Sequence, residues 1–333
     1  MVISRTPFRI SFFGGGTDYP TWYKKNGGVV LATTFNKYCY LTVRFLPPFF
    51  ENKYRIIYTI VESCKNINQV QHPAVREIVK YLKIKEGLEI HHDGDLPARS
   101  GLGSSSAFTV GLLHALYALK GYMPNKQKLA KESIHLEQEV LKETVGSQDQ
   151  VLTAYGGFNH VTFRPDGEMI VKPVTISSQR TEELQTHLML FYTGIARTAS
   201  DVAKTYVNSI DLQKKQLDNI KKLVEEALSL LNSKRDINYF GHLLDKAWQS
   251  KRTLSAAVSS PIIDKLYKQA LSYGAIGGKL TGAGGGGFLL LFVPPSKQAK
   301  VKKEFSKLVH VPFKFEHLGS QIIFYDQQEN YAK

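Results

Sequence analysis

The sequence predicts an α+β protein, in which strands and helices occur without strict alternation. Residues 2–13 alternate apolar and polar side chains and then become apolar throughout, which is typical of a strand. Strand-like runs at 29–32, 38–45 and 54–61 follow one another with no helical run between them. Apolar residues at helical spacing then predict a helix over 72–84. This mixture argues against a regular βαβ order and favours the α+β class.

In the first half of the chain, proline and glycine mark the element boundaries. Pro20 suits the first turn of a short helix that ends at Gly27 and Gly28. The elements expected after it are strands at 29–32, 38–45 and 54–61, a helix at 72–84, a strand at 88–92 and a helix at 108–119.

The second half is predicted to be richer in helix. Pro124 opens a helix that extends to about residue 142, and Gly156 and Gly157 end the helix after it. The later elements are a hairpin of 158–163 with 169–174, strands at 187–192, 288–293 and 321–325, and helices at 198–232, 236–257, 261–273 and 297–308. The polar residues 177–186 look like a domain connection. We therefore expect two domains, residues 1–180 and 181–333.

Composition restricts the class of protein. The chain has 333 residues, of which 43% are hydrophobic, so it can bury sizeable cores. Two cysteines provide no disulfide framework and no cysteine-rich metal cluster, which favours a reducing cytoplasm. We expect no membrane span and no signal peptide, because the sequence has no apolar run of about 18 residues and no apolar signal region at its start.

The net charge of +14 leaves several kinds of partner open. It is compatible with nucleic acid, an anionic surface or an anionic small molecule, and equally with a solvated basic surface. The lysines are spread over predicted helices, and no zinc-finger or basic-zipper spacing is present. We expect a small-molecule partner, no nucleic acid, and a monomer or homodimer.

Residues 97–107 form a Gly/Ser loop that leads into the helix at 108–119. A helix start presents unpaired N–H groups and the positive end of the helix dipole, which bind anions and most often phosphate. Gly101 and Gly103 let the backbone approach phosphate oxygens, and the serines add hydroxyls. No Gly-Lys-Ser/Thr ends the loop, so it is not a Walker A loop. The alternative is a helix cap with additional serines.

Glu137 lies on the apolar stripe of the helix predicted from Pro124. A carboxylate at such a position needs a cation or several hydrogen-bond donors. The alternative is that Glu137 lies at the edge of the stripe and reaches solvent.

Three further segments carry candidate site residues. Three glycines precede Asp18, whose carboxylate is suited to accept from substrate hydroxyls; the alternative is a tight turn with an Asp cap. Ser147 and Gln150 fit a capping box, which places Asp149 in the first turn of a helix, either as a proton acceptor or only as a partner of the helix dipole. The glycines of 277–287 precede a buried strand, with a flexible linker as the alternative.

The glycine-bearing segments, in this order and spacing, resemble the motifs of the GHMP small-molecule kinases over about residues 3–293. The resemblance implies a two-domain GHMP kinase fold, with an N-terminal ATP-binding domain like a domain of a small-subunit ribosomal protein and a ferredoxin-like C-terminal domain. It also implies ATP and Mg²⁺ as cofactors.

The resemblance assigns a role to individual residues. Asp149 matches the catalytic Asp, Arg9 the arginine of the first motif, and Ser105 and Glu137 the Mg²⁺ ligands. ATP would bind at Pro97, Arg99, Ser100, Gly101, Leu102, Gly103, Ser104, Ser105 and Ser106. The substrate would lie against Gly15, Gly16, Thr17, Asp18, Gly284 and Gly285.

Within the family, residues 8–18, 146–150, 192–197 and 277–279 resemble the D-glycero-α-D-manno-heptose 7-phosphate kinases, and the sequence does not match the galactokinases well. Galactokinases carry Gly-Glu-His-Thr-Asp where this chain has Gly14 to Asp18, so a sugar-recognising Glu is absent, which suits a larger or anionic substrate. The implied reaction is phosphorylation of the anomeric hydroxyl to the 1,7-bisphosphate, for nucleotide-heptose and surface-glycan biosynthesis. The alternatives are another sugar 1-kinase, such as a fucokinase- or galactokinase-like enzyme, or a non-catalytic sensor.

Two basic residues are candidates for the substrate phosphate. Arg197 follows a strand end at a glycine turn, and the alternative is that it caps a helix or pairs at the surface. Lys279 faces either phosphate or solvent.

Overall fold

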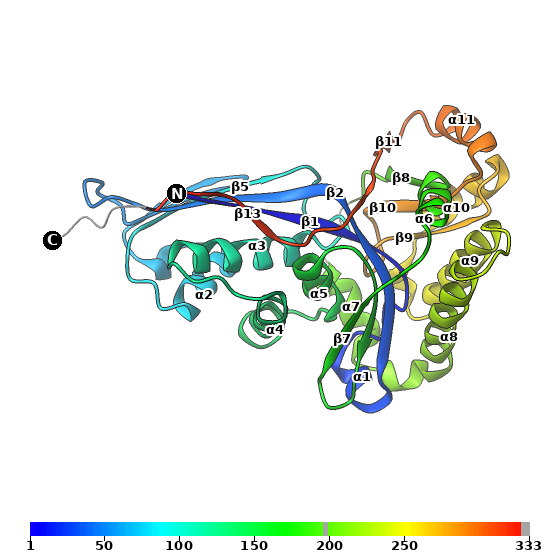
Figure 1. Ribbon diagram of the computed structural model, residues 1–333, viewed down its shortest axis with the longest axis horizontal. Coiled ribbons are helices and arrows are strands. Elements are labelled where there is room, and N and C mark those ends of the chain that lie inside the picture. The colour runs from blue at the N-terminus through cyan, green and yellow to red at the C-terminus, as the bar shows by residue number, and fades with distance from the viewer. Residues whose placement is uncertain (196–198, 328–333) are drawn as a thin grey trace.

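The computed structural model describes residues 1–195 and 199–327, which form a nine-stranded and a four-stranded β-sheet. Helices cover one face of the large sheet, and a second group of helices packs around the small sheet at the other end of the molecule (Figure 1). Both sheets and both helix groups agree with the predicted α+β class. Within the described residues, none of the helices combines the length and apolar character needed to cross a bilayer.

The large sheet is built on two long antiparallel strands, β1 (Val2–Phe13) and β2 (Gly28–Phe45), connected through α1 (Pro20–Asn26). The first part of β2 pairs with β6 (Phe158–Phe163) and the later part with β5 (Leu88–Gly94). A register shift at Pro7 accommodates the change, and a bulge is one of the few places where a proline fits a sheet. The remaining strands of this sheet are β3 (Tyr54–Ile57), β4 (Val61–Cys64), β7 (Met169–Pro173), β12 (Phe315–Glu316) and β13 (Gln321–Tyr325).

The helix α3 (Ser104–Leu119) is the centre of the helical layer under this sheet. It is apolar around its whole circumference because it packs between β1 and β2 on one side and α4 (Lys126–His135) and α5 (Gln148–Tyr155) on the other. Gly111 permits the close approach, since a Cβ there would lie 2.8 Å from Thr6 Oγ1. The helix α2 (Pro73–Tyr81) and a short 3₁₀ turn (Ile67–Gln69) complete the layer.

The small sheet has the order β11-β8-β10-β9, with β10 (Phe288–Phe292) fully buried. Its other strands are β8 (Leu188–Tyr192), β9 (Gly277–Leu280) and β11 (Val309–His310). The helices of this half are α6 (Ser178–Thr186), α7 (Ala199–Val207), α8 (Lys214–Leu231), α9 (Asn238–Arg252), α10 (Pro261–Tyr273) and α11 (Pro295–Glu304), with 3₁₀ turns at Ile210–Gln213 and Ala256–Val258.

Aromatic packing joins the two halves at the end of β1. The rings of Phe12 and Phe13 lie 5.5 and 5.1 Å from the ring of Phe240 on α9, in edge-to-face arrangements. The chain also returns to the large sheet at its end, because β12 pairs with β2 and β13 with β1. The division into residues 1–180 and 181–333 stays a prediction.

Several predicted elements differ from the structure. The two strands expected at 29–32 and 38–45 are the single strand β2, and the strand expected at 54–61 is a hairpin of β3 and β4. The polar segment 177–186 contains helix α6, capped by Ser177, and the helix expected over 198–232 is interrupted at residues 208–213. Strand β9 was missed because its glycine-rich sequence has low strand propensity and is held by pairing with β10.

Candidate active site

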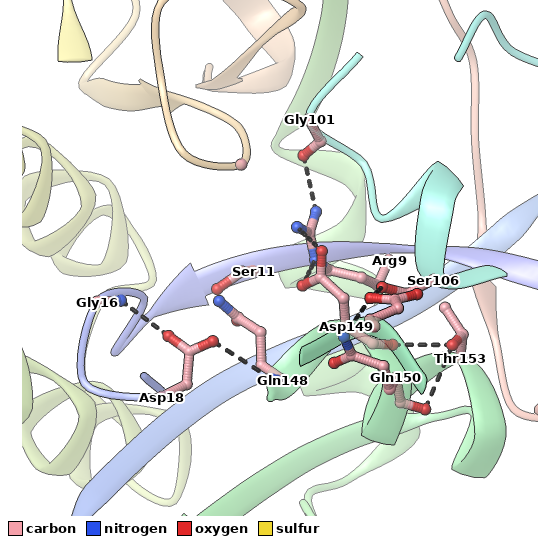
Figure 2. A network of polar contacts seen from close by, with 12 residues as sticks. Arg9, Ser11, Gly16, Asp18, Gly101, Ser106, Gln148, Asp149, Gln150 and Thr153 are labelled. Atoms are coloured by element: carbon pink, nitrogen blue, oxygen red, sulfur yellow. Dashed lines mark hydrogen bonds and ion pairs between the residues drawn. The ribbon is translucent and has the colours of Figure 1, made fainter. Parts of the chain in front are cut away.

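The predicted site segments meet at the end of β1, where the N-termini of α3 and α5 converge (Figure 2). Arg9 and Ser11 lie on β1, Asp18 lies in the turn that follows, and Asp149 lies in the first turn of α5. Positions far apart in the sequence are therefore brought together as the resemblance implies.

Arg9 and Asp149 form a bidentate ion pair. Nε and Nη2 of Arg9 donate to Oδ1 and Oδ2 of Asp149 at 2.7 and 2.6 Å, and Nη1 donates to the carbonyl oxygen of Gly101 at 2.7 Å. The arginine is 3% exposed whereas the Asp149 side chain is 24% exposed, so the carboxylate is the partner that a ligand can reach. The planar guanidinium of Arg9, bound through two parallel hydrogen bonds, fixes the orientation of the Asp149 carboxylate.

The phosphate-binding loop predicted at 97–107 lies against the glycine-rich loop that precedes β10. A Cβ on Gly101 would lie 2.6 Å from the carbonyl oxygen of Thr281, and one on Gly282 would lie 2.5 Å from the Cα of Gly101. Gly103, with φ of 76°, is the N-cap of α3, and no side chain caps this helix. Glycine is needed at 101 and 282 because two backbone segments cross there, and at 103 because the N-cap residue adopts a left-handed conformation.

The individual residues of this loop differ in exposure. Pro97, Arg99 and Ser105 are exposed, Ser104 is half-buried, and Ser100, Leu102 and Ser106 are buried. The backbone of Leu102 accepts a hydrogen bond from Arg9 N at 3.0 Å, which ties the loop to β1.

Glu137 is a fully buried carboxylate, and it lies in a π-helical turn, Leu136–Val140, that follows α4. Ser106 Oγ donates to its Oε2 at 2.9 Å, and Gln150 Nε2 donates to the same oxygen. Oε1 has no hydrogen-bond partner among the described residues. Burial, with a smaller contribution from the Glu143 carboxylate, raises the pKa of Glu137 to about 8.

An unpartnered buried carboxylate oxygen beside serine hydroxyls fits a divalent cation. Among the described residues, no cluster of three or more His, Cys, Asp or Glu side chains could hold a metal alone. This is compatible with Mg²⁺, which is commonly bound through one or two carboxylates together with water and substrate phosphates. Ser106 donates a hydrogen bond to Glu137, whereas Ser105 forms none with it.

The predicted capping box of Ser147 and Gln150 is wrong. Ser147 is the N-cap residue of α5, but its side chain caps nothing and instead accepts from Gln138 Nε2 at 3.1 Å. The Gln150 side chain donates to the buried carboxyl group of Glu137 instead.

The Asp18 carboxylate is fixed by backbone N–H groups. Gly16 N donates to Oδ1 at 2.9 Å and Gln148 N to Oδ2 at 3.3 Å, and the side chain is buried. Burial is the main cause of the raised pKa of Asp18, and the negative charge of Asp149 adds to it. Thr17 is a structural residue, since its hydroxyl donates to the carbonyl oxygens of Gly14 and Val29.

Two residues beside this turn were missed at the sequence level. Ser11 Oγ and Gln148 Oε1 are buried and have no hydrogen-bond partner within the described residues. Both side chains flank Gly15, where a Cβ would lie 3.5 Å from Gln148 Nε2 and 3.6 Å from Ser11 Oγ. Unsatisfied buried polar atoms are costly unless a ligand supplies their partners, so Ser11 and Gln148 are candidate substrate contacts. Each is a polar residue on an otherwise buried face, which is the signal that could have identified it.

The remaining predicted residues divide into three cases. Gly284 and Gly285 pack on the turn at Val258, where Gly285 N donates to its carbonyl oxygen at 2.9 Å. Lys279 does not face solvent: it is 3% exposed, and its Nζ donates to the carbonyl oxygens of Ser11 and Phe12 at 2.8 and 2.9 Å. Arg197 lies outside the described residues.

Comparisons with known proteins identify the family of the chain. The models of the GHMP kinase N-terminal and C-terminal domains match residues 68–157 and 224–310. A D-glycero-alpha-D-manno-heptose 7-phosphate kinase of Campylobacter jejuni is 29% identical over 91% of this chain and 93% of its own length. The crystal structure of a putative sugar kinase from Campylobacter jejuni is 28% identical, with a TM-score of 0.70, over 97% of this chain and 98% of that one.

The fold itself recurs in a more distant structure. The crystal structure of a D-glycero-D-manno-heptose 1-phosphate kinase from Bacteroides thetaiotaomicron covers 100% of both chains with a TM-score of 0.79 at 22% identity. Because the N-terminal and C-terminal domain models of one family match successive parts of this chain, the chain belongs to the GHMP kinase family.

Proposed function

We propose that this chain is an ATP-dependent sugar kinase that phosphorylates the anomeric hydroxyl of D-glycero-D-manno-heptose 7-phosphate and forms the 1,7-bisphosphate. The ion pair of Arg9 and Asp149 is the observation that carries the proposal. It places a reachable carboxylate beside the loop that is suited to bind phosphate. The names of the similar Campylobacter and Bacteroides proteins support a heptose phosphate as the substrate class.

In the proposed reaction, Asp149 accepts the proton of the C1 hydroxyl. The hydroxyl oxygen then forms a bond to the γ-phosphorus of ATP, the bond from that phosphorus to the bridging oxygen breaks, and ADP leaves. Phosphoryl transfer depends mainly on positioning and on stabilisation of charge. Arg9 performs both tasks, because it orients Asp149 through two hydrogen bonds and places its positive charge beside the transferring group.

The loop at 97–107 and the turn at 14–18 are proposed to hold the two substrates. The uncapped start of α3 presents backbone N–H groups to the phosphates of ATP. Asp18, Ser11 and Gln148 provide oxygens for sugar hydroxyls. Glu137, together with a hydroxyl of Ser105 or Ser106, would hold Mg²⁺, which offsets phosphate charge when it is bound.

A coupled assay of ADP release tests the substrate. ATP and Mg²⁺ are supplied with heptose 7-phosphate, heptose 1-phosphate, fucose, galactose or mannose, and the position of the new phosphate is determined by NMR. Preference for heptose 7-phosphate with a product phosphorylated at C1 supports the proposal. Preference for fucose or galactose would instead indicate a different sugar 1-kinase, and turnover of heptose 1-phosphate at C7 would reverse the proposed chemistry.

The role of Asp149 is tested by Asp149→Asn, with Asp166→Asn in the exposed hairpin turn as the matched control. We expect kcat to fall by about 100-fold or more in the first variant, because a general base contributes about 10²–10⁴ in rate. The Kd for ATP should change little in both. Near-normal turnover of Asp149→Asn would refute the assigned role.

A further inference from the structure

A buried lysine that the sequence motifs do not include lies beside the candidate site. Lys251, one residue before the end of α9, is 6% exposed. Its Nζ donates to the carbonyl oxygen of Gly282, and within residues 1–195 and 199–327 it forms no ion pair. A buried ammonium whose direct partner is a neutral carbonyl retains a positive charge that needs an anion.

The contacts of Lys251 place it at the crossing of the two glycine loops. Gly282 lies against Gly101, and the carbonyl oxygen of Gly101 accepts from Arg9 Nη1 at 2.7 Å. Arg9 arrives from the large sheet, whereas Lys251 arrives from a helix that packs on the small sheet. Two cations from opposite halves of the molecule therefore converge on the loop that is proposed to bind the phosphates of ATP.

The charges around this point do not balance. The charged side chains that act on Lys251 are Arg9, Asp18, Asp149 and Lys279. Three of the five residues are cationic and two are acidic, so the group carries an excess of one positive charge when all are ionised. Burial and, to a smaller extent, the charge of Arg9 lower the pKa of Lys251 to about 8. This direction is expected of a buried ammonium that has no anion in direct contact.

Lys279 is less suited to contact that anion. Its ammonium has three N–H donors, of which two are used by the carbonyl oxygens of Ser11 and Phe12. These bonds tie the end of β1 to β9. Lys251 uses one donor on Gly282 and keeps two for a ligand.

We propose that Lys251 is a further phosphoryl-binding residue, which contacts the γ-phosphoryl group of ATP during its transfer to the sugar. This inference rests on the proposed kinase activity. Charge in phosphoryl transfer is spread over three equatorial oxygens, so an ammonium and a guanidinium are able to stabilise it together. The covalent step is unchanged, since Lys251 neither gains nor loses a proton in it.

The test uses Lys251→Met, which keeps the length of the stem and removes the charge, with Lys246→Met on the exposed face of the same helix as control. We expect kcat of Lys251→Met to fall by about 100-fold, a loss typical of one preorganised transition-state contact. The melting temperature should not fall, because an apolar group replaces a buried charge. Turnover within threefold of the wild type, or a loss equal to that of Lys246→Met, would overturn the proposal.

Binding measurements separate this role from two others. The Kd values of ADP and of adenylyl imidodiphosphate, a non-hydrolysable ATP analogue, are measured without sugar. The ratio of the Kd for ADP to the Kd for the analogue should be about tenfold smaller in Lys251→Met than in the wild type. A raised Kd for the sugar phosphate with an unchanged nucleotide ratio would overturn the proposal and place Lys251 on the sugar phosphate. If the wild type phosphorylates no sugar, the proposed function fails, whereas the nucleotide ratio still tests the contact.

The pH profile gives a readout that a structural lysine would not move. In the wild type, kcat/KM should decline above about pH 8 as Lys251 loses its proton. In Lys251→Arg, activity should be partly retained and the decline should shift to higher pH, because a guanidinium stays protonated. An identical basic limb in both proteins would overturn the assignment.

Discussion

Replacing Gly146 by alanine tests how firmly the turn at Asp18 is fixed. A Cβ on Gly146 would overlap the Asp18 carboxylate, lying 2.7 Å from its Cγ, so the carboxylate or the segment at 146–148 must move. Movement weakens the hydrogen bonds from Gly16 N and Gln148 N, and each bond to a charged group is worth about 1.5–3 kcal/mol. Alanine also reduces the conformational entropy of the unfolded chain, which stabilises the folded state by up to about 1 kcal/mol and offsets part of this loss. We therefore expect unfolding to become easier by about 2 kcal/mol.

Urea denaturation and sugar kinetics measure the two consequences of Gly146→Ala. The midpoint should fall, and the KM for the sugar should rise more than the Kd for ATP, because Asp18 is proposed to contact the sugar. The matched control is Gly15→Ala in the same turn, where the new methyl group would make only ordinary contacts of 3.5 and 3.6 Å. That variant should keep wild-type stability but lose turnover. Wild-type stability and KM in Gly146→Ala would refute the reasoning.

Three further predictions concern buried polar groups. Glu137→Gln should raise the Mg²⁺ concentration for half-maximal activity by about tenfold or more, without lowering the urea midpoint; an unchanged Mg²⁺ requirement would contradict the metal role. Ser320→Ala removes the hydroxyl that lies 2.8 Å from Thr6 Oγ1 and 3.0 Å from His114 Nδ1, and should cost about 2 kcal/mol in urea unfolding. Lys251→Met should exceed the wild type in stability near pH 7 by about 1–2 kcal/mol, because the lost hydrogen bond to the Gly282 carbonyl offsets part of the gain from removing a buried charge, and the difference should shrink between pH 8 and 10.

The sign of the last prediction follows from proton binding. Burial lowers the pKa of Lys251 to about 8 in the folded state, from the ordinary lysine value of 10.5. Between these values the unfolded chain binds more protons than the folded one, so the stability of the wild type rises with pH. Lys251→Met lacks this titration, and other ionisable groups cancel in the comparison. Parallel stability curves for the two proteins from pH 7 to 10 would contradict the lowered pKa.

The candidate site was largely predictable where local sequence dictates backbone conformation. Gly101 is required where two backbone segments cross, and Gly103 is required because the N-cap residue of α3 has a positive φ. Both requirements are visible in the sequence as glycines. Asp149 was placed correctly in the first turn of a helix, although the capping box used to locate that helix does not form. The helix start was right because Ser147 is the N-cap residue of α5, although its side chain accepts from Gln138 instead of capping the helix.

Long-range pairing was less predictable. The strand β2 continues through Asn36 and Lys37 because β1 remains paired to both of its halves, and no local signal announces this. The segment 177–186 is polar enough for a loop, yet it forms α6, which buries Leu184. In the loop predicted to bind phosphate, the order of three serines could not show that Ser106 contacts Glu137, since this depends on how α3 is rotated against the π-helical turn.

Lys251 was missed although the rule that identified Glu137 applies to it. Buried residues of α9 recur at helical spacing, at Leu244, Ala247 and Trp248, and Lys251 continues this stripe. In the sequence, Lys251 cannot be told apart from the many surface lysines, because only its burial in the folded structure distinguishes it from them. A charged residue on an apolar stripe requires a partner of opposite charge. Applied to the segment of Glu137 and to α9, this requirement predicts two protein groups that bind different parts of one ligand. The carboxylate of Glu137 would bind the metal ion, and the ammonium of Lys251 would bind the phosphoryl group that the metal accompanies.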